Sequence, residues 1–194
     1  MNVLEAIRKR RTIRKFKAGE VPIDVLKELV DLARLAPSAA NLQPMEFILV
    51  TEPAARESLF EKLAFGAYVK PKRNPGPESR PGAYIVSLWN RKKSDFAQWE
   101  VGAGLQNILL GAVEKGLGAC WLGGIDRDGI REQLSIPRDV DVLAVIAVGQ
   151  ADEEPVLEER DDTIKYWLDP KDVLHVPKRS LSSVLYMESY KISR

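Results

Sequence analysis

Apolar residues along this chain follow two different spacings, which indicates a protein built from both helices and strands. Where apolar side chains recur every three or four positions, we predict helices over residues 2–10, 22–36, 54–64, 97–116 and 126–134. Where they form short continuous runs, we predict strands over residues 47–50, 83–89, 119–125 and 142–149.

The longest predicted helix contains an unusual number of small residues. They are Gly102, Ala103, Gly104 and Gly111. A glycine inside a helix costs roughly 1 kcal/mol relative to alanine, so several of them need a packing reason. We expect this helix to approach another helix closely, in the same chain or in a partner.

Two segments lack a regular spacing of apolar residues. Residues 71–81 combine Pro, Gly, Lys and Arg, and we predict a mobile loop there. From Ala151 onward the chain is first acidic and then mixed, with scattered apolar side chains. A tail of this kind has no core of its own, so we expect it to lie on another surface, such as a partner subunit.

Composition limits the classes of protein to consider. The chain has 194 residues, 45% of them hydrophobic, which suits one globular domain over residues 1–194. Lys and Arg number 29 against 28 Asp and Glu, so no overall field favours nucleic acid or a membrane. A single cysteine and the absence of an apolar leader or spanning segment predict a soluble, cytoplasmic protein.

The segment from Arg10 to Phe16, Arg-Arg-Thr-Ile-Arg-Lys-Phe, places four cations and a hydroxyl directly after a predicted helix. Such a cluster suits an anion, although basic residues also favour helix C-termini and can simply be solvated there. The chain has no phosphate-loop motif, no GxGxxG after a strand and no Cys/His metal spacing. The common nucleotide-binding and zinc-binding classes are therefore not indicated.

The same segment resembles the Arg-Arg-Ser-x-Arg-x-Phe motif of the nitroreductase-like flavoproteins. Residues 36–44 are similar to the APSxxNxQP loop of that family, and residues 116–124 are similar to its GLGxxWxGG strand and turn. Gln106-Asn107 and a strand ending at Gly149 occupy the family's positions between and after them. Because these segments keep the family's order over essentially the whole chain, the protein is identified as a member.

Membership implies an α+β, nitroreductase-like fold with a central, mostly antiparallel sheet flanked by helices. It also implies an intertwined homodimer, with a C-terminal extension at about 151–194 that covers the partner, and one FMN in each of two interface sites. The implied activity is an NAD(P)H-dependent FMN oxidoreductase that passes hydride by a ping-pong mechanism to nitroaromatic, quinone or similar small-molecule acceptors. The flavin carries this chemistry, so no catalytic side chain and no metal are expected.

The resemblance assigns roles in FMN binding to individual residues. Arg10 matches a phosphate ligand, Thr12 keeps the hydroxyl of the usual serine, and Arg11 adds backbone or side-chain contacts. Arg14 would face the pyrimidine edge of the ring and stabilise the anion of the reduced flavin. We assign Lys15 to solvent and Phe16 to the core.

Three further segments complete the predicted site. Residues matching flavin contacts from the partner subunit are Pro37, Ser38, Ala39 and Asn41. Residues matching the turn beside the reactive edge of the ring are Leu122, Gly123 and Gly124, and glycine there lets main chain approach the flavin. Residues that would complete the phosphate site from the C-terminal tail are Lys178 and Arg179.

Other interpretations stay open at this point. The protein could bind flavin for sensing or storage, perform a specialised flavin-dependent reduction, or be a nucleic-acid-binding module, which the near-zero charge disfavours. We expect Cys120 to be a small buried residue and His175 a hydrogen-bonding one, while Trp121 fits a core position or a position near the flavin. Candidates for further contacts to the pyrimidine edge are Lys70, Lys72, Arg73 and Asn74.

Overall fold

Four antiparallel strands form the central sheet in the computed structural model, which describes residues 1–69, 74–94 and 98–190. The strands are β1 (Met45–Val50), β2 (Ala83–Asn90), β3 (Gly118–Leu122) and β4 (Val140–Gly149), in the order β1-β2-β4-β3. Every pairing in this sheet is antiparallel. The α+β class with an antiparallel sheet is thus confirmed.

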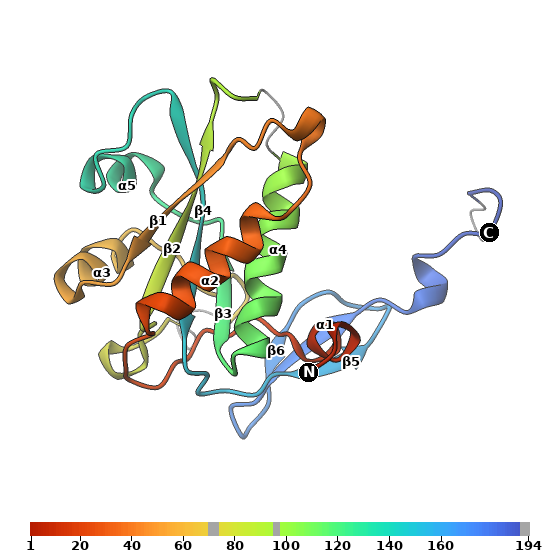
Figure 1. Ribbon diagram of the computed structural model, residues 1–194. Coiled ribbons are helices and arrows are strands. Elements are labelled where there is room, and N and C mark those ends of the chain that lie inside the picture. The colour runs from red at the N-terminus through yellow and green to blue at the C-terminus, as the bar shows by residue number, and fades with distance from the viewer. Residues whose placement is uncertain (70–73, 95–97, 191–194) are drawn as a thin grey trace.

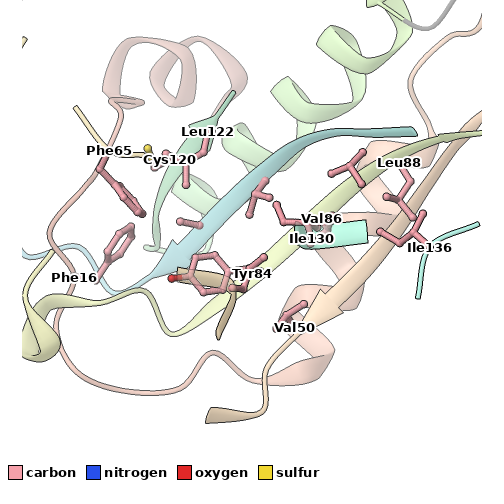
Figure 2. Close-up of a cluster of buried hydrophobic side chains, with 14 of the residues drawn as sticks. Phe16, Val50, Phe65, Tyr84, Val86, Leu88, Cys120, Leu122, Ile130 and Ile136 are labelled. Carbon is pink, nitrogen blue, oxygen red and sulfur yellow. The ribbon is translucent and has the colours of Figure 1, made fainter. Parts of the chain in front are cut away.

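Helices cover both faces of the sheet (Figure 1). On one face lie α2 (Ile23–Arg34) and α4 (Gln98–Glu114), and on the other lie α3 (Pro53–Phe60) and α5 (Arg127–Gln133). Strand β2 shows why two layers form, because its side chains alternate between the two cores. Ala83 and Ile85 pack with α2 and α4, whereas Tyr84, Val86 and Leu88 belong to the cluster in Figure 2.

The small residues of α4 allow α2 to approach it closely. A Cβ added at Gly111 would lie 2.5 Å from Leu32 Cδ1, and one added at Gly104 would lie 3.3 Å from the Ala33 carbonyl oxygen. At Gly102 an added Cβ would meet nothing within 4 Å. The expected close helix contact is confirmed, and for Gly104 and Gly111 it is made within this chain.

The first helix and the basic segment lie at the free edge of the sheet. Helix α1 (Val3–Lys9) begins at a capping box formed by Asn2 and Glu5. After it, Thr12 pairs in parallel with Ala119 of β3, and Ile13 N–H donates to the Ala119 carbonyl at 3.0 Å. The segment therefore runs along β3, and Phe16 is buried in the core as predicted.

The C-terminal tail is more regular than its sequence indicates. It forms a small sheet of β5 (Val156–Glu159), β6 (Trp167–Leu168) and β7 (Leu174–Lys178), in the order β5-β7-β6. These strands are short and their side chains do not alternate cleanly between buried and exposed, so the sequence pattern does not reveal them. Beyond the turn Leu181–Ser183 the chain projects away from the body of the protein (Figure 1).

The segment predicted as a mobile loop is only partly described, since residues 70–73 lie outside the described residues. The candidate flavin contacts Lys70, Lys72 and Arg73 are among them. Its described end contains a short turn, Pro77–Ser79. Arg80 forms ion pairs with Glu57 and Glu61 and lies 4.0 Å from the ring centroid of Phe60, so this end is attached to α3 and to the residue that follows it. Across the ranges that the structure covers, no helix is long and apolar enough to cross a bilayer.

Candidate functional site

The first part of the predicted site is the basic segment at the edge of β3. Arg10 ends α1, and its N–H donates to the Ala6 carbonyl at 2.9 Å. Arg10, Arg11 and Thr12 are all half-buried, and the Arg11 guanidinium donates back to the Arg10 carbonyl. Burial and the adjacent charge of Arg10 lower the pKa of Arg11 from its ordinary value. Cations are thus concentrated where the chain leaves the helix, as an anion site requires.

Arg14 is half-buried, like the other three cations of the segment. Its guanidinium lies over the ring of Tyr166, 5.0 Å from the centroid, and the backbone N–H of Arg14 donates to the Glu153 carboxylate. Its side-chain Nε is buried and has no hydrogen-bond partner among the described residues. A buried guanidinium N–H without an acceptor fits a site that receives an anionic or carbonyl-bearing group.

Lys15 lies at the protein surface, but an ion pair holds its side chain instead of leaving it free in solvent. Its ammonium lies 2.5 Å from the Asp172 carboxylate, and its backbone N–H donates to Glu153 at 3.1 Å. Both partners belong to the C-terminal part of the chain, whose packing the sequence pattern does not show. The C-terminal part of the chain therefore contacts the basic segment directly.

The glycine turn follows directly at the end of β3. Leu122 is buried in the core, whereas Gly123 and Gly124 are exposed, and a Cβ added at Gly123 would meet nothing within 4 Å. Neither glycine amide donates to an acceptor in the described part of the chain. Two free N–H groups on open main chain suit hydrogen bonding to a flat carbonyl-bearing ring.

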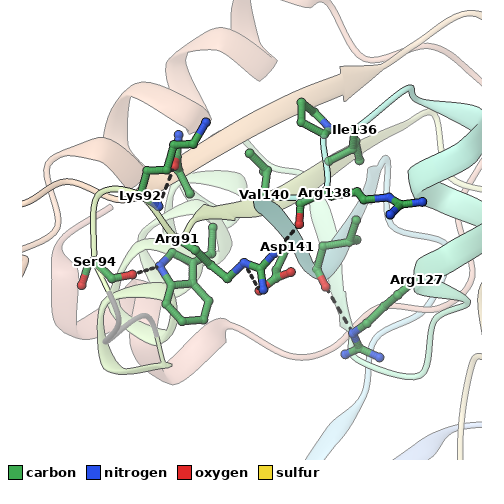
Figure 3. A network of polar contacts seen from close by, with 12 residues as sticks. Arg91, Lys92, Ser94, Arg127, Ile136, Arg138, Val140 and Asp141 are labelled. Atoms are coloured by element: carbon green, nitrogen blue, oxygen red, sulfur yellow. Dashed lines mark hydrogen bonds and ion pairs between the residues drawn. The ribbon is translucent and has the colours of Figure 1, made fainter.

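Hydrogen bonds to its two carbonyl oxygens fix the main chain of the turn. Ala64 N–H donates to the Gly124 carbonyl at 2.9 Å, and the Arg127 guanidinium donates to the Gly123 carbonyl at 3.4 Å. Arg127 also donates to the Val142 carbonyl of β4 at 3.2 Å (Figure 3). Both carbonyls are therefore hydrogen-bonded by other parts of the chain, whereas the two amides donate to no acceptor among the described residues.

The loop of Pro37, Ser38, Ala39 and Asn41 joins α2 to β1 and lies elsewhere in the chain. Its Ala39 N–H donates to the carboxylate of Glu100, in the first turn of α4, at 2.7 Å. Arg11, by contrast, shares a groove with Gly116, which follows the last turn of α4. The 17 residues of α4 span about 25 Å. One chain thus places the basic segment beside β3, whose last residue precedes Gly123, but it leaves the loop at the other end of the helix.

Lys178 and Arg179 lie exposed at the end of β7. The Lys178 carbonyl accepts from Arg160 N–H at 2.8 Å, and the Arg179 guanidinium donates to the Ser183 carbonyl. Within the described residues neither side chain hydrogen-bonds to the segment 10–14. Their place in a phosphate site stays a prediction.

Three residues that shape the site are missing from the sequence-based set. Glu100 holds the loop, Glu153 accepts hydrogen bonds from the backbone of Arg14 and Lys15, and Tyr166 lies under Arg14. Each is far from its partner in sequence. Glu100 is visible in the sequence only as an acid in a first helical turn, and Tyr166 only as an aromatic residue in the tail. Neither signal identifies the residue that it contacts.

The remaining candidates have structural positions. Cys120 is buried in the core, as expected, and burial raises its pKa to about 12. His175 Nδ1 lies 2.7 Å from the Glu158 carboxylate, which agrees with a hydrogen-bonding role. Trp121 is 40% exposed, so a core position for it is wrong. The described residues contain no cluster of His, Cys, Asp and Glu that could hold a metal ion.

Fold and site together define an α+β protein in which an antiparallel sheet lies between two helical layers, with a basic segment and a glycine turn along one edge strand. The sequence profile of the nitroreductase family matches residues 7–150. The chain belongs to the nitroreductase family.

Relatives and solved structures agree with this assignment. A Methanothermobacter thermautotrophicus protein with the provisional name NADH dehydrogenase/NAD(P)H nitroreductase is 37% identical over 161 residues, covering 80% of each chain. An NADH dehydrogenase of Thermus thermophilus is 28% identical over 75% of this chain and 85% of its own. The structure of an FMN-dependent nitroreductase from Clostridium difficile R20291 superposes with a TM-score of 0.71 at 25% identity, covering 97% of this chain and all of its own.

Proposed function

We propose that this protein is an FMN-dependent oxidoreductase that takes reducing equivalents from NADH or NADPH. The observation that carries the proposal is the buried Nε of Arg14, which lacks an acceptor among the described residues. The open main chain at Gly123, which follows the last residue of the same edge strand, supports it. The relatives support it by their names, which refer to NADH, NAD(P)H and FMN.

The residues present fit FMN at both of its charged ends. Arg10, Thr12 and Arg11 would hold the phosphate where the chain leaves α1, with Lys178 and Arg179 as further cations from the tail. Arg14 would face the pyrimidine edge of the ring, and the amides of Gly123 and Gly124 would hydrogen-bond to its reactive edge. The two groups of contacts are separated along β3, in line with an elongated ligand.

The complete site needs two copies of the chain. Pro37, Ser38, Ala39 and Asn41 lie at the far end of α4 from Arg10, so a homodimer would supply them from the other subunit. Apolar surface supports association. A groove of about 460 Å³ between α1, α2 and α4 is lined partly by Val3, Leu32 and Leu35. The projecting tail adds exposed apolar side chains, which are Leu181, Val184, Leu185, Met187 and Tyr190.

When bound, FMN supplies the redox chemistry, accepting hydride from the nicotinamide and passing two electrons to an acceptor in a ping-pong sequence. The chain's own part is to bind, orient and polarise. The Arg14 cation would stabilise negative charge on the ring, and the turn amides would fix its orientation. Planar acceptors such as nitroaromatics and quinones suit a site formed between two subunits.

The test separates the two half-reactions. Under anaerobic conditions the purified, FMN-loaded protein is mixed with NADH or NADPH and its flavin absorbance is followed, and then a quinone or nitroaromatic is added. Bleaching by a nicotinamide and recovery with the acceptor are the expected results. Bound flavin that no nicotinamide bleaches would favour a sensing or storage role, and protein that cannot take up FMN would overturn the proposal.

A further inference from the structure

The loop between α2 and β1 holds an unfavourable backbone shape. Ala40, Asn41 and Gln43 have φ angles of 47°, 57° and 49°. Residues with a Cβ avoid this left-handed region, and they remain there only when surrounding contacts over-determine the conformation. The loop therefore needs specific contacts that hold it.

Most of these contacts are local to the loop. Asn41 N–H donates to the Ser38 carbonyl and Gln43 N–H donates to the Ser38 hydroxyl, each at 3.0 Å. Core packing gives little further support. Two hollows, of about 240 and 360 Å³, both border Pro37, Ser38 and Glu100. A contact from outside the loop is thus needed to fix its position relative to the rest of the fold.

Glu100 makes that contact. Its Oε1 accepts from Ala39 N–H at 2.7 Å, so α4 is connected to the middle of the loop. A hydrogen bond to a carboxylate is stronger than one between neutral groups, and here it lies in a partly buried setting.

The Glu100 carboxylate is itself unusual. The residue is only 6% exposed, and its Oε2 is buried without a hydrogen-bond partner among the described residues. Burying a carboxylate oxygen in this way is unfavourable, although the N-terminal turn of a long helix offsets part of the cost. A buried acid whose one described hydrogen bond is to the Ala39 amide indicates that this contact is its role.

We propose that Glu100 is a positioning residue for the flavin. By holding Ala39, it keeps residues 37–43 in the shape that presents Ser38 and Asn41 to the FMN of the other subunit. The inference rests on the proposed function, because it takes the loop to be part of an FMN site. It extends that function to a residue that does not itself touch the cofactor.

Three substitutions separate hydrogen bonding from charge and from bulk. Glu100→Ala removes the acceptor, and Glu100→Asp withdraws it by one methylene while keeping the charge. Glu100→Gln keeps an acceptor oxygen at nearly the same place and should rescue the function. Glu132→Ala, on an exposed turn of α5, is the matched control for loss of a carboxylate away from the loop.

FMN affinity of the apoprotein, measured by quenching of flavin fluorescence, is one readout, and amide hydrogen exchange in residues 36–44 without FMN is the other. Glu100→Ala and Glu100→Asp should bind FMN about tenfold to a hundredfold more weakly and exchange faster in the loop. Glu100→Gln and Glu132→Ala should stay within about threefold of the wild type.

Wild-type affinity and loop exchange in Glu100→Asp would overturn the inference, and so would a Glu100→Gln variant as impaired as Glu100→Ala. Amide hydrogen exchange measured without FMN distinguishes a failure of this inference from a failure of the proposed function. Wild-type protein that binds no FMN contradicts the proposed function, whereas unchanged loop exchange in the variants contradicts the role of Glu100 alone.

Discussion

The guanidinium of Arg14 lies over the ring of Tyr166, 5.0 Å from its centroid. This contact joins the basic segment near the N-terminus to the C-terminal tail. Lys15 and Asp172 form a second link between the same two segments. The tail therefore packs against the side chain of Arg14, which belongs to the proposed site.

Replacing Arg14 with alanine should lower the reduction potential of bound FMN, because the cation that stabilises the reduced anion is lost. A charged hydrogen bond of about 1.5–3 kcal/mol corresponds to about 30–60 mV for a two-electron couple. The potential is measured by spectroelectrochemical titration against a reference dye.

Replacing Arg10 with alanine should chiefly weaken the retention of FMN. Loss of a phosphate contact is expected to weaken FMN binding about tenfold to a hundredfold while the potential changes little. Equilibrium dialysis of the two variants side by side checks this division. If both substitutions changed potential and affinity equally, the separate assignments of Arg10 and Arg14 would be wrong.

Gly118 should not tolerate a side chain. A Cβ at this position would lie 2.9 Å from Ile13 Cβ, which would push the basic segment away from β3. Gly118→Ala is expected to cost about 1–3 kcal/mol in unfolding free energy. It should also weaken FMN binding, because Thr12 and Arg14 flank Ile13.

Gly102→Ala is the control for Gly118→Ala, since an added Cβ there meets nothing within 4 Å. In a helix interior this change should raise stability by about 0.4–1 kcal/mol. Urea denaturation at one fixed protein concentration compares both variants. A Gly118→Ala protein as stable as Gly102→Ala would contradict the close packing at β3.

Cys120 should be unreactive in the folded protein. Burial raises the pKa of its thiol to about 12, the charge of Arg14 opposes this shift and Glu153 adds to it. The thiolate that attacks disulfide reagents is thus nearly absent at pH 8. Ellman's reagent should label one thiol per chain in denaturant and almost none in the native protein. Rapid labelling of the native protein would contradict the burial of Cys120 in the core.

Glu46 should make stability depend on pH in the acid range. Hydrogen bonds from Asn90 and from Lys93, each at 3.0 Å, hold the pKa of this carboxyl below its usual value. Since the folded pKa is below the unfolded one, the stabilisation is complete above about pH 4.3 and is lost as pH falls through the folded pKa.

Glu46→Gln keeps an acceptor but does not titrate. The difference in unfolding free energy between wild type and Glu46→Gln should be constant from pH 5 to 8 and should shrink at lower pH. Thermal unfolding across pH 3 to 8 measures this difference. A difference that grows on acidification would show that folding raises the pKa of Glu46 instead of lowering it.

The sequence predicts those parts of the fold and site that depend on local pattern. The basic segment, the Ser38 loop and the Gly123 turn are visible because each is a contiguous motif with its own spacing. The continuous apolar run of β2 is typical of a strand buried on both faces, and its side chains enter both core clusters.

The sequence does not predict contacts that arise only when distant segments meet. Nothing local distinguishes Glu100 from other acids in first helical turns, and its burial results from the packing of α4 under the loop. Tyr166 lies in a tail whose short strands lack a period, so its position below Arg14 cannot be read from the chain.

We propose that each FMN site is built from two copies of the chain, since the loop and Arg10 lie at opposite ends of α4. Arg10→Ala should disable one half of each site, and a variant with Ser38 and Asn41 both replaced by alanine should disable the other half. The two variants, carrying different affinity tags, are produced together, and the doubly tagged dimers are purified.

In these mixed dimers one site carries both defects and the other carries none. About one of every two sites should therefore bind FMN with wild-type affinity, although each variant alone binds it weakly. Mixed dimers in which every site stays as weak as in the parent variants would show that each FMN is held by a single chain.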